Sequence, residues 1–107
     1  MIKLSVVIIT YNEENNIERC LQSVKDIADE IIVLDSFSTD NTKKICESYK
    51  VKFSQHNFDG HIEQKNRAVS LAENLYVLSL DADEMLSEKL TDSILEIKQN
   101  PEFDAYY

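Results

Sequence analysis

The chain alternates short apolar runs with longer amphipathic stretches. Short runs at residues 4–10, 30–34, 51–54 and 75–80 predict strands, and the first, which is β-branched and almost continuously apolar, has the pattern of a strand covered on both faces, with residues 30–34 a second buried strand. Apolar residues at helical spacing follow each run and predict helices over residues 17–24, 42–49, 62–72 and 90–97, the last capped by Ser87. Residues 103–107 have the pattern of a further strand. This alternation predicts an α/β fold, with an open, mainly parallel sheet, helices on both faces and right-handed crossovers.

Size and composition narrow the class of protein. A chain of 107 residues fits one domain, and 43% hydrophobic with 29% charged residues is ordinary for a globular protein. No apolar run approaches the roughly 20 residues needed to cross a bilayer, and the start of the chain lacks a signal-peptide pattern, so we expect a cytoplasmic location. Cys20 and Cys46 fall on helical apolar positions, which predicts buried, reduced thiols.

The charge balance bears on possible ligands. The formal net charge of −9 argues against nucleic acid as a partner, because phosphate neutralisation needs clustered Lys and Arg. It is compatible with a nucleotide ligand, since a divalent cation can bridge two anionic groups.

Polar clusters follow three of the four predicted strands. They are Thr10-Tyr11-Asn12-Glu13, Asp35-Ser36 and Asp81-Ala82-Asp83. Because the carboxyl ends of parallel strands share one edge of a sheet, and ligands bind at that edge, we expect Asp35, Asp81 and Asp83 to face one crevice with Thr10 and Glu13. Carboxylates gathered in one cleft repel one another, and Mg²⁺ or Mn²⁺ would relieve the repulsion.

Each acidic cluster also has a simpler interpretation. Asp81-x-Asp83 alone could be an acidic turn, and Asp40 or Thr39 could cap the following helix, an interpretation we adopt for residues 38–42. Capping does not explain Asp35, which ends a strand before any helix begins. A carboxylate there can accept a hydrogen bond from a nucleobase N–H or a ribose hydroxyl.

Three segments together resemble family 2 glycosyltransferases with the GT-A fold. These are residues 5–14 (SVVIITYNEE), 35–42 (DSFSTDNT, as Asp-x-x-Ser-x-Asp-x-Thr) and 80–84 (LDADE, as Asp-x-Asp). Their order and spacing match the family over essentially the whole chain. Residues 58–67 (FDGHIEQKNR) further resemble a subgroup that glucosylates lipopolysaccharide core, although Phe58 stands where Trp is more usual and His-Ile follows Gly60.

The resemblance implies a nucleoside pocket. In it, Thr10, Tyr11 and Glu13 would line the wall, with Tyr11 beside the base. Asp35 would accept a hydrogen bond from the base, which in this family is most often uracil.

The resemblance also implies roles for residues nearer the sugar and the diphosphate. Lys65 stands where the family places a basic residue near the nucleotide, although a solvated helix charge explains it equally well. Asp81 would contact the ribose or the donor sugar, and Asp83 would hold the divalent cation on the diphosphate.

The implied reaction is an inverting, metal-assisted transfer of a hexose from a nucleoside diphosphate sugar, expected to be a UDP-sugar, to an acceptor hydroxyl. The acceptor would be a saccharide or lipid-linked saccharide of the cell envelope, with the full-length enzyme peripheral at the inner membrane. The family's general base is expected beyond Tyr107, so residues 1–107 would form a donor-binding part that lacks the acceptor part and is inactive alone. Its cut sheet edge favours self-association.

Other residues and other protein classes were weighed. Glu84 is expected to be a first-turn helix carboxylate, and His56 and His61 to be surface or packing residues. A dinucleotide-dependent oxidoreductase would need a glycine-rich turn after the first strand, where this chain has none, and a receiver domain would need paired acids there. A noncatalytic protein-interaction α/β module stays open.

Overall fold

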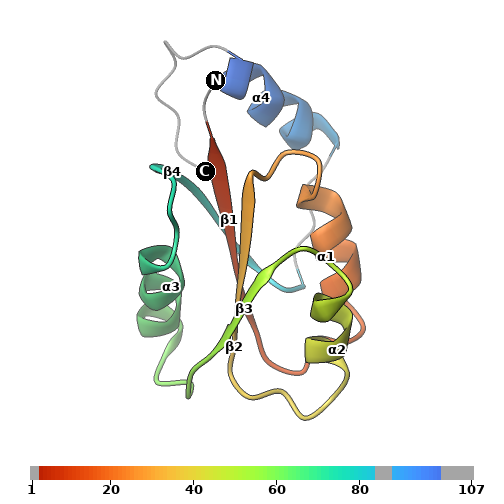
Figure 1. Cartoon of the computed structure of the whole chain (residues 1–107), viewed down its shortest axis with the longest axis vertical. Helices are drawn as coiled ribbons and strands as arrows, with labels where there is room; N and C mark the ends of the chain where they lie inside the picture. The colour runs from red at the N-terminus through yellow and green to blue at the C-terminus, as the bar shows by residue number, and fades with distance from the viewer. Residues whose placement is uncertain (1–2, 84–87, 100–107) are drawn as a thin grey trace.

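The structure is a computed structural model that describes residues 3–83 and 88–99 (Figure 1). Its elements, in chain order, are β1 (Leu4–Thr10), α1 (Ile17–Val24), β2 (Glu30–Asp35), α2 (Thr42–Glu47), β3 (Lys52–Gln55), α3 (His61–Ser70), β4 (Tyr76–Asp81) and α4 (Glu88–Gln99). The strands and helices predicted between residues 4 and 97 are confirmed. The predictions for Glu84, Ser87 and residues 103–107 lie outside the described residues.

The strands of the described part form a parallel sheet in the order β3-β2-β1-β4. The chain builds outward from β1 to β2 and β3, then crosses to the other side of β1 to lay down β4. The order therefore reverses between β1 and β4, and a sheet of this kind leaves a crevice at the carboxyl ends of those two strands. β3 and β4 are the sheet edges within the described residues, and the predicted self-association through an edge stays a prediction.

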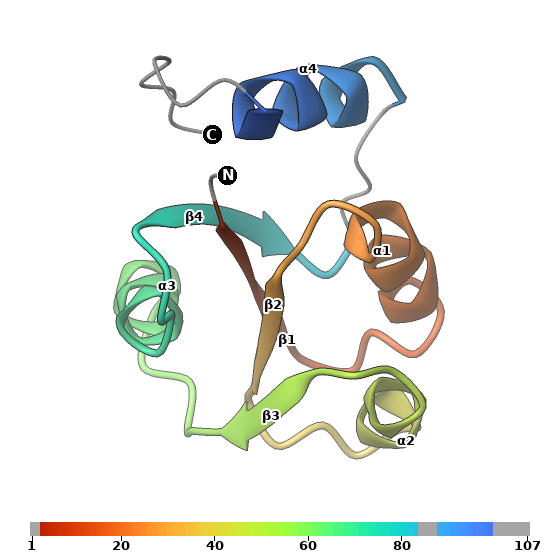
Figure 2. The same ribbon diagram turned by 45° about the horizontal axis from the view of Figure 1, so that its top comes forward.

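Helices cover both faces of the sheet, as predicted. Figure 2 shows α1 and α2 on one side and α3 on the other. Alternate residues of β1 divide between the two layers: Val6 and Ile8 join the cluster that contains residues of α1, α2 and α4, whereas Val7 and Ile9 pack with Ala68 of α3. This division follows from the period of two in a strand, and it decides which strand-end side chains face α3.

The two cysteines are buried thiols rather than disulfide partners, which confirms the prediction. Burial, aided by the negative charges of Asp35 and Glu47, raises the pKa of Cys46 to about 12, so this thiol stays protonated. Among the described helices, none is both long enough and apolar enough to span a bilayer.

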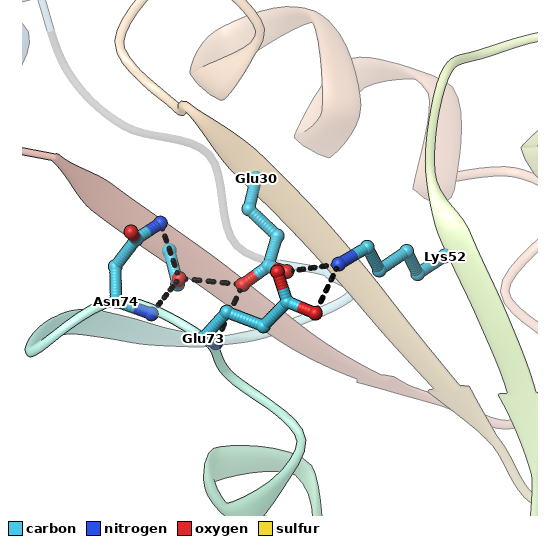
Figure 3. A network of polar contacts seen from close by, with 5 residues as sticks. Glu30, Lys52, Glu73 and Asn74 are labelled. Carbon is cyan, nitrogen blue, oxygen red and sulfur yellow. Dashed lines mark hydrogen bonds and ion pairs between the residues drawn. The ribbon is translucent and has the colours of Figure 1, made fainter.

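A polar network joins the amino ends of the strands, at the edge opposite the predicted crevice (Figure 3). Glu30, whose side chain is 8% exposed, accepts hydrogen bonds from the Ser5 hydroxyl at 2.6 Å and the Glu73 backbone N–H at 2.9 Å, and it pairs with Lys52. Ser5 in turn accepts bonds from the backbone and side-chain amides of Asn74 at 3.3 and 3.1 Å. One carboxylate thus ties β1, β2 and β3 to the turn before β4.

The hydrogen bonds of this network set the pKa of Glu30. Burial alone would raise that pKa, but the bonds from Glu73, Lys52 and Ser5 outweigh it and lower the pKa from 4.5 to about 2. Because the folded state binds this proton more weakly than the unfolded state, the network contributes its full stability above about pH 4.5. That contribution is lost as the pH falls towards 2.

We therefore expect Glu30→Gln to lower the free energy of unfolding by about 1–2 kcal/mol at pH 7, less than the pKa shift alone implies because Lys52 is solvent-exposed. Urea unfolding of the wild type and the variant, at a series of pH values from 7 to 3, measures the difference. It should shrink below about pH 4.5. A difference that is constant across this series would contradict the account.

Candidate functional site

A row of polar side chains crosses the carboxyl ends of three strands. In the sheet register, Thr10 of β1 lies opposite Asp35 of β2, and Asp35 lies opposite Gln55 of β3. The Asp35 carboxylate is fully buried and accepts bonds from the Thr10 hydroxyl at 2.6 Å and from Gln55 Nε2 at 3.2 Å. The backbone N–H and hydroxyl of Ser38 add bonds of 2.8 and 2.5 Å. These four bonds fill the acceptor positions that a carboxylate offers.

Reciprocal hydrogen bonds join the loop after β1 to the loop after β2. The Asn12 N–H donates to Ser38 Oγ at 2.8 Å, and Asn12 Oδ1 accepts the Thr39 N–H at 2.8 Å. Further along, the Glu13 N–H donates to Thr42 Oγ1 at 2.9 Å. Asn12 has a φ of 50°, in the left-handed region that Asn tolerates better than most residues. The paired loops hold the backbone of residues 11–13 in one position over the end of β1.

The N-cap residue of α2 is Asn41, which makes no side-chain capping bond, and the predicted cap Asp40 lies one position earlier and bonds the first residue of the helix. Asp40 accepts bonds from the N–H and the hydroxyl of Thr42, at 2.9 and 2.6 Å. Its other oxygen accepts the Glu14 N–H at 3.1 Å. Partial burial opposes ionisation, but these bonds dominate and lower the pKa of Asp40.

A pocket of about 200 Å³ lies at the carboxyl ends of β1 and β4, where the strand order reverses. It is lined by Ile9, Thr10, Tyr11, Glu13, Ser36, Phe58, His61, Gln64, Asp81, Ala82 and Asp83. Five of the predicted site residues thus share one hollow, namely Thr10, Tyr11, Glu13, Asp81 and Asp83. The expectation that distant strand ends converge on one crevice is met for these residues.

Asp35 lies behind the wall of this pocket rather than in it. Its side chain is fully buried and its acceptor positions are filled from within the protein, so a base N–H would have to displace one of those donors. The contact predicted between Asp35 and a base is therefore not available in this conformation. The next residue, Ser36, stands in the wall instead, and its backbone N–H is fixed by a 2.9 Å bond to the Thr10 carbonyl.

Lys65 approaches the pocket through Asp81. Its Nζ lies 3.5 Å from Asp81 Oδ1, and both side chains are about two-fifths exposed, at 43% and 41%. Lys65 does not line the pocket, yet its charge lies beside a residue that does. Lys65 is thus both a solvated charge on a helix and a cation close to the pocket, so its position agrees with both interpretations.

The loop before α3 and the first turn of α3 form one wall of the pocket, which was not predicted from the sequence. Gly60 turns the chain into α3 with a φ of 136°, a conformation that few residues other than glycine adopt. Phe58 and His61 lie on either side of it, with ring centroids 5.2 Å apart in an edge-on contact. His61 packs as expected, but it also faces the pocket. Gln64 is fully buried one turn further along α3.

The donor set suits one kind of divalent cation. Within residues 3–83 and 88–99, no group of three or more His, Cys, Asp or Glu side chains gathers to form a complete metal site. Asp81 and Asp83 nevertheless share the pocket. Mg²⁺ and Mn²⁺ in nucleotide sites commonly take one or two carboxylates and complete their shell with phosphate oxygens and water. The residues present fit a cation that arrives with a diphosphate.

The fold and the pocket define an α/β domain with a hollow at the switch point of a parallel sheet, where domains of this class bind their ligands. The family model for glycosyl transferase family 2 matches residues 5–107, and the chain belongs to this family. It is 45% identical over 104 residues to a glycosyltransferase of Rickettsia bellii, a match covering 97% of this chain and 35% of the relative. It is 32% identical over 99 residues to the lipopolysaccharide core biosynthesis glycosyltransferase LpsC of Rhizobium meliloti, covering 88% and 36%. The chain thus spans about a third of the length of these relatives.

Solved structures confirm the fold expected from the family resemblance. The chain is similar to residues 1–349 of TarS from S. aureus in complex with UDP, with a TM-score of 0.70, 30% identity, and coverage of 94% of this chain and 33% of that one. It is also similar to glucosyl-3-phosphoglycerate synthase of Mycobacterium tuberculosis in complex with Mn²⁺, UDP and glucosyl-3-phosphoglycerate. That match has a TM-score of 0.68 and 26% identity, and it covers 78% and 35% of the two chains.

The structure predicts that Asp35 and Asp83 have different roles. Asp35→Ala would leave the donors of Thr10, Ser38 and Gln55 without their acceptor, and should lower the free energy of unfolding by about 3 kcal/mol. Asp83→Ala removes an exposed side chain and should change it by less than about 0.5 kcal/mol. Urea unfolding without ligand measures both. Equal effects of the two substitutions would show that Asp35 does not hold the strand ends together.

Proposed function

We propose that this chain is the donor-binding part of a family 2 glycosyltransferase and binds a nucleoside diphosphate sugar in the pocket between β1 and β4. The observation that carries the proposal is the convergence of two separate strand ends. Thr10 ends β1 and is followed by Tyr11 and Glu13, whereas Asp81 ends β4 and is followed by Asp83, and all five line one hollow. The UDP in both solved relatives supports a nucleotide as the ligand, and UDP-sugars as its class.

The aromatic side chains give the pocket a nucleoside end. Tyr11 is 58% exposed and Phe58 52% exposed, although both line the pocket, so their ring faces are accessible to a planar ligand. We place the base against these rings, because aromatic side chains and bases stack favourably. The ribose and the first sugar then lie towards Asp81, with the Lys65 ammonium beside them to offset the diphosphate charge.

The acidic end of the pocket suits the metal and the diphosphate. We assign Asp83 as the protein ligand of Mg²⁺ or Mn²⁺, with Asp81 oriented by Lys65 to contact the ribose or the donor sugar. A cation bound there would neutralise the negative charge that develops on the departing diphosphate. Mn²⁺ accompanies UDP in the mycobacterial relative, which supports this assignment.

The reaction that this site would serve is the transfer of a hexose to an acceptor hydroxyl with inversion at the anomeric carbon. The pocket of about 200 Å³ is smaller than the roughly 300–1,000 Å³ usual for ligand sites, as expected if the described residues supply part of the wall. We place the general base and the acceptor site outside residues 1–107, and expect this chain alone to bind donor without transferring sugar. The similarity to LpsC supports a saccharide acceptor of the cell envelope.

A thermal-shift titration tests donor binding and the metal assignment together. UDP with Mn²⁺ should raise the melting temperature of the wild type, and Asp83→Asn should weaken the Mn²⁺-dependent part of UDP affinity at least tenfold, since it removes the charge that holds the cation. The matched control is Asp26→Asn, which removes one exposed carboxylate from the turn after α1, away from the pocket.

Two outcomes would refute the proposal. A folded wild-type sample with no response to any nucleoside diphosphate and Mn²⁺ would favour the noncatalytic interaction module. Equal losses in Asp83→Asn and Asp26→Asn would show that general charge, and not a ligand at Asp83, controls binding.

A further inference from the structure

A chain of hydrogen bonds runs from the surface to the pocket wall through α3. Arg67 donates to both oxygens of Asp59, from Nη1 at 3.1 Å and from Nη2 at 2.9 Å. Nη1 also donates to Gln64 Oε1 at 2.8 Å. On the other side of the same amide, Gln64 Nε2 donates to Ser36 Oγ at 3.1 Å. Gln64 itself is fully buried, so solvent does not compete for its amide.

The direction of each bond in this chain is fixed by chemistry. A guanidinium only donates, so the Gln64 atom that faces Arg67 must be the carbonyl oxygen. The amide nitrogen must then face Ser36, and it only donates as well. Ser36 Oγ is therefore obliged to accept from Gln64, and its own proton is left for another partner. Within the described residues, Ser36 donates its hydroxyl proton to no protein acceptor, and the residue lines the pocket.

Resting on the proposed nucleotide site, we propose that Ser36 is a specificity-determining residue that donates a hydrogen bond to a carbonyl on the edge of the nucleobase, and that Gln64 and Arg67 are positioning residues that keep it a donor. Uracil presents a carbonyl oxygen where cytosine presents an amino group. A hydroxyl held as a donor can bond the carbonyl oxygen of uracil, but it cannot bond the amino group of cytosine, which is also a donor. The relay would thus select uridine over cytidine nucleotides.

The position of Ser36 suits this role. It follows Leu34 by two residues, and Leu34 belongs to the core cluster on the α3 side of the sheet, so the strand alternation turns Ser36 towards α3 and away from the buried Asp35 network. Its backbone is held by the bond to the Thr10 carbonyl, which leaves the side-chain torsion as its adjustable part. Gln64 then restricts that torsion from the other side.

The test compares UDP and CDP affinities, each with Mn²⁺, for the wild type and three variants of the protein. The wild type should bind UDP about tenfold more tightly than CDP. Ser36→Ala removes the donor and should bring the ratio of the two affinities close to one. Gln64→Glu keeps the shape of the side chain but replaces the amide donor with an acceptor, which captures the Ser36 proton. The ratio should then fall at least tenfold, so that CDP binds as well as UDP or better.

The third variant, with both substitutions, separates positioning from a general effect of the new charge. If the Gln64→Glu substitution acts through Ser36, adding it to Ser36→Ala leaves the affinity ratio unchanged, even if both affinities fall. Thermal melts show whether each variant folds. If Gln64→Glu does not fold, the affinity ratio of Ser36→Ala alone decides whether the inference holds.

Three results would overturn the inference. They are a wild type without preference for UDP, an unchanged ratio in Ser36→Ala, or a further shift of the ratio in the double variant. In each of these cases the nucleotide still binds and the proposed function stands. A wild type that binds neither nucleotide would overturn both.

Discussion

The buried Asp35 carboxylate is the constraint on which the geometry of the pocket depends. It accepts hydrogen bonds from β1 through Thr10, from β3 through Gln55, and from the following loop through Ser38. A buried carboxylate with its acceptors filled tolerates little displacement of these donors, because each lost bond leaves a desolvated polar group. The ends of three strands are thereby fixed relative to one another, and the paired loops that carry Tyr11 and Glu13 inherit that fixed position.

The polar groups that hold the strand ends together differ from those that line the pocket. At the amino ends of the strands, Glu30 joins neighbouring strands in a similar way. Each end of the sheet is thus held by its own carboxylate and several donors. At the carboxyl ends, polar groups that line the pocket lie near α3. Asp81 meets Lys65 there, and Ser36 meets Gln64. Burial separates the two roles: buried acids hold the strands in place, and partly exposed acids and hydroxyls face the pocket.

Much of this arrangement could be predicted from the sequence because it follows from periodicity. Apolar runs and helical spacing gave the order of elements, and the rule for parallel strands brought Thr10 and Asp81 to one edge. The role of Asp35 could not be obtained in this way, since an acid at a strand end has the same sequence signature whether it faces the ligand or the interior. The alternation in β2 held a partial signal, because Ser36 shares its side of the strand with Leu34 and faces α3.

Gln64 and the aromatic residues Phe58 and His61 show a second limit of prediction from sequence. Gln64 lies one helical turn before the buried Ala68, on the apolar stripe of α3, where a polar residue indicates a hydrogen-bonding role. Its partner Ser36 is 28 positions away, and no spacing rule joins the two. Phe58 and His61 reach the pocket through the turn at Gly60, whose backbone conformation depends on the tertiary structure.

Paramagnetic broadening by Mn²⁺ tests most directly whether the carboxyl edge of the sheet is the donor site. In an amide NMR spectrum of the ¹⁵N-labelled protein with UDP, trace Mn²⁺ should broaden the signals of Ala82 and Asp83 first, followed by those of Tyr11 and Glu13. The signals of Glu30 and Asn74, at the opposite edge, should stay sharp. Broadening centred on Glu30 and Asn74, or spread evenly over the acidic surface, would contradict the account.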